Sequence, residues 1–93
     1  MVIGVLRVEL HLPNAASLKD KRSVLKSIKD RLRGHFNLAV AEVDVTEKWQ
    51  RATLGIVTVG DDRRYVDGCL RHVSAWLDEH REAVVVRVEQ EMF

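Results

Sequence analysis

The spacing of apolar residues restricts the fold of this chain more than any other feature of its sequence. Over residues 2–12, apolar side chains recur at every second position, as in a strand with one buried face. From Leu18 to Leu32 they recur at every third or fourth position, as on one face of a helix. Ser17 before this helix and Gly34 after it are typical cap residues. The chain therefore begins with a strand followed by a helix.

Further strands and one further helix are predicted after residue 34. Residues 36–45 and 51–59 are predicted strands, and the short polar turn at residues 46–50 makes them an antiparallel pair. A second helix is predicted from Gly60 to about His80, with an apolar face made of Val66, Leu70, Val73 and Leu77. The last predicted strand covers residues 83–92, which are rich in valine.

The resulting order is strand, helix, strand, strand, helix, strand. With right-handed crossovers, this order predicts an α+β, ferredoxin-like fold in which two helices cover one face of a four-stranded antiparallel sheet. We expect residues 1–93 to form a single domain of this kind.

The other face of the predicted sheet has no helix to cover it. Alternation places these first-strand residues on the open face: Ile3, Val5, Arg7, Glu9 and His11. The expected last-strand counterparts are Ala83, Val85, Arg87, Glu89 and Glu91. Half apolar and half charged, this surface is a candidate for homodimer formation.

Positive charge is concentrated in residues 17–34. This segment holds seven basic and two acidic residues, a net charge of +5, whereas the whole chain carries +1. At about 100° per residue, five of the cations fall within roughly 80° of each other and form a ridge about 21 Å long. This basic ridge consists of Lys19, Arg22, Lys26, Lys29 and Arg33. We expect Asp20 and Asp30 to lie outside it and to leave it uncompensated along the helix.

The basic ridge has two interpretations. It can contact the phosphates of structured RNA or of a ribosome, which releases counterions and relieves the repulsion between like charges. Alternatively, it is a solvated helix surface whose lysine and arginine stems cover apolar groups.

Three other side chains are candidates for a functional role. Lys21 falls on the apolar face of the first helix, so it either extends past the sheet edge to solvent, pairs with a buried carboxylate such as Glu42, or lines a small-molecule cleft with Glu42. Trp49 is expected at an exposed turn, where it packs on its own hairpin or contacts a partner.

Several classes of function find no support in the sequence. The four histidines are not clustered, Cys69 flanks a core face, and the glycines form no phosphate-binding loop, so we assign no catalytic residues, metal or cofactor. Residues 2–12 and 51–59 contain no Phe, Tyr or Trp to stack RNA bases. No apolar run approaches the ~20 residues of a membrane span. The single cysteine suits a reducing compartment, and we expect a cytoplasmic protein.

The run SLKDKRSVLKSIKDRLRGHFNLAVAEV, followed by Trp49 and by TLGIV, resembles the YlxP-like family, also called domain of unknown function family 503. The resemblance extends over essentially the whole chain. It implies a small bacterial protein with a ferredoxin-like fold and no established activity, so it supplies no catalytic residues. It also implies an RNA-related setting, because members are often encoded beside genes for translation initiation and ribosome maturation.

Overall fold

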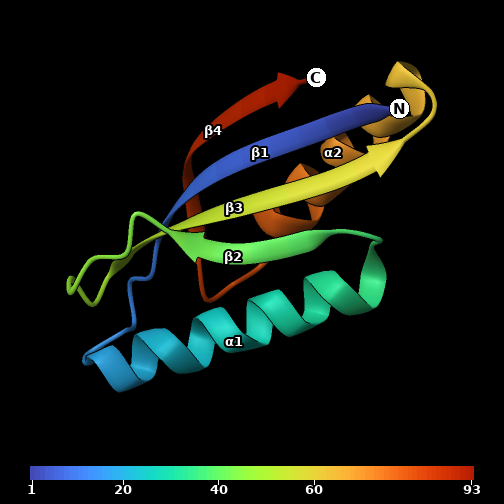
Figure 1. The fold of residues 1–93 in the computed structure, drawn as a ribbon. Helices are drawn as coiled ribbons and strands as arrows, with labels where there is room; N and C mark the ends of the chain where they lie inside the picture. The colour runs from blue at the N-terminus through green and yellow to red at the C-terminus, as the bar shows by residue number, and fades with distance from the viewer.

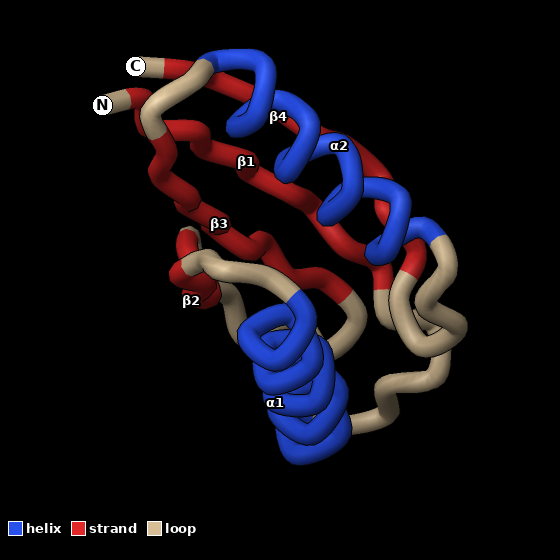
Figure 2. Tube along the Cα trace, turned by 90° about the vertical axis from the view of Figure 1, so that its right-hand side faces the viewer, coloured by secondary structure: helices blue, strands red, loops and turns tan.

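The computed structural model describes residues 1–93, and Figure 1 shows six elements in the predicted order. These elements are β1 (Val2–His11), α1 (Leu18–His35), β2 (Ala39–Val43), β3 (Arg51–Gly60), α2 (Arg63–Asp78) and β4 (Val84–Met92). The strands form one sheet in the order β2-β3-β1-β4, and every neighbouring pair is antiparallel. Figure 2 shows both helices on the same side of this sheet. The predicted α+β, ferredoxin-like fold is confirmed.

The core lies between the sheet and the two helices. Alternate residues of the two central strands, such as Leu6 of β1 and Ile56 of β3, are fully buried. They pack with the apolar faces of the helices, represented by Ile28 of α1 and Leu70 of α2. Full burial of a leucine or isoleucine contributes about 1.5–3 kcal/mol. The apolar residues at every second position of the strands and at every third or fourth position of the helices therefore account for the layered arrangement.

Side-chain hydrogen bonds fix the start of α1. The Ser17 hydroxyl accepts from the backbone N–H of Asp20 at 3.0 Å, and the Asp20 carboxylate accepts from the N–H of Ala16 at 3.0 Å. These bonds satisfy amides that lack partners at a helix N-terminus. At the other end, Gly34 has no positive φ and the helix continues to His35, one residue beyond the predicted stop.

The strand β2 is shorter than the segment predicted at residues 36–45. Phe36 is the C-cap of α1, and its N–H donates to the carbonyl of Leu32 at 2.9 Å. At the other end, Asp44 has a φ of 49°, a left-handed conformation that interrupts an extended chain. The predicted strand is therefore shortened at its start by the end of α1 and at its end by the turn that begins at Asp44.

A bulge in β4 changes which residues face the open side of the sheet. Arg87 pairs with Glu9, but Val85 pairs with Leu10, so Val86 is an extra residue between them. An insertion of one residue exchanges the two faces of a strand. Arg87, Glu89 and Glu91 lie on the open face as predicted, but the placement of Ala83 and Val85 there is wrong because both face the helices.

No helix of the structure has the length and apolar content needed to cross a lipid bilayer.

Candidate functional site

The basic ridge lies along the side of α1 that borders the edge strand β2. Figure 1 shows α1 running beside β2, and the Arg33 guanidinium donates to the backbone carbonyl of Val40 in that strand at 3.0 Å. Four of the five ridge residues are exposed, and Lys29 is half-buried. The five predicted residues therefore share one surface at the edge of the sheet.

Asp30 lies at the border of the ridge and compensates part of its charge, so the expectation that the ridge stays uncompensated along the helix is wrong. Its carboxylate accepts from Lys26 at 2.7 Å and lies 3.4 Å from the Arg33 guanidinium. Residues three and four apart are neighbours on a helix, and Asp30 stands in that relation to both cations. The hydrogen bond from Lys26 lowers the pKa of Asp30, and the charges of Lys26, Arg33 and Lys29 lower it further.

The other three ridge residues, Lys19, Arg22 and Lys29, form no salt bridge, whereas Asp20 is engaged with the backbone at the start of the helix. With Asp30 counted against five cations, the basic ridge keeps a formal charge of +4. The uncompensated cations are the exposed Lys19 and Arg22 at the N-terminal end of the ridge and the half-buried Lys29 beyond Lys26.

Lys21 is buried, with 3% of its surface exposed, so the predicted extension to solvent is wrong. Its ammonium group donates to the backbone carbonyls of Thr46 and Lys48 at 2.7 and 3.1 Å. It also lies 3.4 Å from a carboxylate oxygen of Glu42, so the pairing with this residue is present. The Glu42 Oε2 atom is buried and accepts no hydrogen bond, so its contact with Lys21 is an ion pair only. Through its two hydrogen bonds to backbone carbonyls, Lys21 fastens the β2–β3 loop to α1.

Trp49 lies in the same loop and is 51% exposed, as expected from its place in a polar turn. The loop is held on the side after Trp49 as well, because the Gln50 side chain donates to the carbonyls of Pro13 and Ala15 at 3.2 and 3.3 Å. Trp49 is thus presented to solvent by a segment that is attached on both sides of it.

Some charged contacts of the sheet were not predicted. Arg7 forms ion pairs with Asp44 and with Glu89, the latter at 3.7 Å, at the centre of the open face. The alternation in β1 places Arg7 on that face, whereas Asp44 follows the end of β2 and has a left-handed backbone, which alternation does not predict. No group of three or more His, Cys, Asp or Glu residues is arranged to hold a metal ion.

Comparison with known proteins identifies the family of the chain. Residues 3–90 match the family described as "Protein of unknown function (DUF503)". The chain is also similar to "Uncharacterized protein YlxP" of Bacillus subtilis (strain 168), with 36% identity over 81 residues, covering 87% of this chain and 88% of the relative. Both matches span most of the fold described above, and this chain therefore belongs to the DUF503 family.

Proposed function

We propose that this protein is a non-catalytic, cytoplasmic RNA-binding protein that contacts phosphates of structured RNA or of a ribosome through the basic ridge. The observation that carries the proposal is the set of three ridge cations without an ion pair: Lys19, Arg22 and Lys29. Backbone phosphates are the partners that such a row of cations suits best, because each contact neutralises a charge and releases a counterion.

The geometry favours contacts with phosphates over contacts with bases. The ridge residues recur at helical spacing over about 21 Å, so they can follow a nucleic-acid backbone. The open face of β1 and β3 carries no Phe, Tyr or Trp on which bases could stack. We therefore expect binding that depends strongly on salt and weakly on sequence.

Titration of an RNA hairpin, followed by fluorescence anisotropy at several salt concentrations, tests the proposal. Replacing Lys19, Arg22 and Lys29 by Gln should weaken binding and reduce the slope of log K against log salt by about 2–3, since each lost phosphate contact removes about 0.7–0.9. The matched control variant has the same change of charge at Arg51, Arg63 and Arg64. Equal loss in both variants, or binding independent of salt in the unaltered protein, would contradict the role of the ridge.

A second candidate function is that of a homo-oligomeric interaction module that uses the open sheet face. Val59 and Phe93 are 50% and 66% exposed at one end of this face. Val59 pairs with Ile3 across the sheet, and Ile3 exchanges two backbone hydrogen bonds with Phe93, so the three side chains adjoin. An exposed apolar row of this kind is typical of an association surface.

A further inference from the structure

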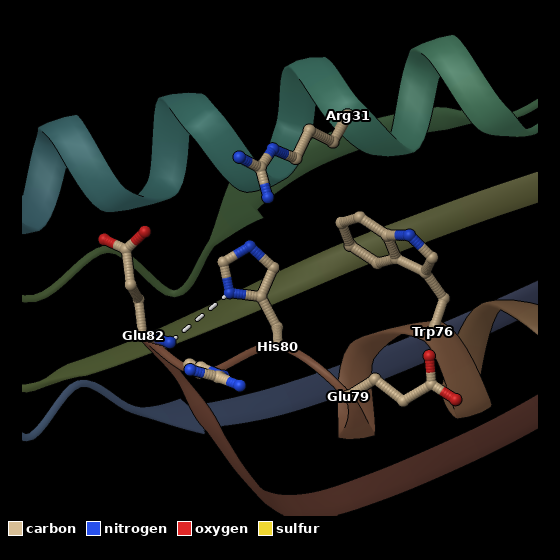
Figure 3. Close-up of a pocket in the computed structure, with 6 residues that line it drawn as sticks. Arg31, Trp76, Glu79, His80 and Glu82 are labelled. Atoms are coloured by element: carbon tan, nitrogen blue, oxygen red, sulfur yellow. Dashed lines mark hydrogen bonds between the residues drawn. The ribbon is translucent and has the colours of Figure 1, made fainter.

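A cavity of about 350 Å³ lies between the two helices, away from the basic ridge. It is lined by Arg31, Trp76, Glu79, His80, Arg81 and Glu82. Figure 3 shows Arg31 reaching down from α1 while the other residues come from the end of α2 and the loop that follows it. At about 100° per residue, Arg31 is on the opposite side of α1 from the ridge. The cavity is therefore a separate site.

His80 lines this cavity and has a ring nitrogen without a hydrogen-bond partner. Its Nδ1 accepts from the backbone N–H of Glu82 at 3.4 Å, so the neutral ring carries its proton on Nε2. The Nε2 atom is buried and has no hydrogen-bond partner in the protein. In Figure 3 this side of the ring faces Arg31. A buried donor without a partner is costly, and an acceptor bound in the cavity would remove that cost.

Two positive charges and an aromatic wall complete the surroundings of His80. Neither Arg31 nor Arg81 has a carboxylate within salt-bridge distance. The Trp76 indole packs edge-on against the His80 ring, with the centroids 5.5 Å apart and an interplanar angle of 61°. The guanidinium groups favour an oxyanion that can accept two parallel hydrogen bonds, and the indole favours a flat apolar group beside it.

The two carboxylates of the cavity have different positions. In Figure 3 the Glu79 carboxylate points away from the His80 ring, whereas that of Glu82 lies across the ring from Trp76. Glu82 therefore limits the affinity of the cavity for an anion more than Glu79 does, because like charges repel at short distance.

We propose that this cavity binds a small aromatic molecule carrying one oxyanion, either a carboxylate or a phosphate. The oxyanion accepts from His80 Nε2 and from Arg31, and the aromatic ring packs against Trp76. Small-molecule pockets measure about 300–1,000 Å³, so this cavity at the lower end of that range admits a ligand of one or two rings.

Tryptophan fluorescence can follow binding directly, because the chain has two tryptophans and Trp49→Phe leaves Trp76 as the sole reporter. This variant is titrated with phenyl phosphate, with benzoate and with neutral benzamide. A saturable change with either anion and none with benzamide supports the proposal, and the stronger of the two identifies the oxyanion. No saturable change with either anion up to about 1 mM, or an equal response to benzamide, would overturn it.

Second substitutions in the same background assign the contacts. Arg31→Gln should raise the dissociation constant of the bound anion about tenfold or more, as expected for loss of a charge-assisted hydrogen bond. His80→Phe should also weaken binding, and Glu82→Gln should strengthen it. The matched control is Arg63→Gln, which makes the same change of charge on α2. Equal weakening by Arg31→Gln and Arg63→Gln would show general charge attraction and would contradict the site. RNA binding through the ridge is measured separately, so either proposal can fail alone.

Discussion

The ammonium group of Lys21 is surrounded by three oxygen atoms from Glu42 and from the β2–β3 loop. Lys21→Met keeps the packing of the stem but removes the ion pair of a buried Glu42 oxygen that has no hydrogen-bond partner, which should destabilise the fold by about 3 kcal/mol. Urea denaturation measures this loss. Adding Glu42→Leu should recover most of it, because the unpaired carboxylate is then removed. A loss below about 1 kcal/mol for Lys21→Met would indicate that the pair is a surface interaction.

The carboxylate of Asp30 provides a prediction about pH. Its pKa is lowered below 3.8 chiefly by the hydrogen bond from Lys26. A folded-state pKa below the unfolded value gives a stabilisation that is present above the unfolded pKa and is lost as the pH falls through the folded pKa. Lys26→Gln should move the pKa of Asp30 back toward 3.8, as measured by NMR titration of its carboxyl carbon. An unchanged pKa in this variant would exclude Lys26 as the main cause.

Among the elements, the helices and strands were predictable because each buries one face and so repeats at its own spacing. The bulge in β4 was not, since Val84, Val85 and Val86 are alike and no alternation marks the extra residue. The start of β2 was also predicted too early in the chain. Phe36 and Leu38 extend the apolar pattern of the strand, and only the tertiary structure shows that they lie outside it.

The contact between β1 and α2 depends on the absence of a side chain at Gly4. A Cβ atom there would lie 2.6 Å from Val66 Cγ1 and 2.8 Å from Leu70 Cδ1, so Gly4→Ala should force α2 away from the sheet and cost about 1–3 kcal/mol. The matched control is Gly68→Ala in α2, where nothing lies within 4 Å. That change should stabilise the helix by about 0.5–1 kcal/mol. Thermal unfolding of both variants checks the opposite signs, and destabilisation by both would argue against the close approach.

At the scale of the whole molecule, the candidate sites differ in how far the sequence could locate them. The basic ridge is formed within one helix, so helical geometry placed its five residues on one surface. The compensation by Asp30 was missed because the helical angle places Asp30 just outside the ridge. The long Lys26 side chain nevertheless extends to its carboxylate. The cavity at His80 combines Arg31 with residues about 45 or more positions later, and only the packing of α1 beside α2 brings them together.

The open sheet face and the basic ridge are compatible with each other, because the face is opposite the helices and the ridge lies at the β2 edge. Two copies joined through the open face would leave both ridges accessible, and an RNA long enough to reach both would then bind with increased avidity.

Association through this face predicts that light scattering gives a mass near twice 10.6 kDa at high protein concentration. Val59→Lys should return the protein to the monomer mass, because it places a charge in the apolar row of Ile3, Val59 and Phe93. Val45→Lys is the matched control, since Val45 is 74% exposed but lies in the loop after β2. A monomer mass for the unaltered protein at every concentration excludes the dimer, and an equal effect of the two substitutions places the contact elsewhere. Far-UV circular dichroism of Val59→Lys separates loss of association from loss of folding.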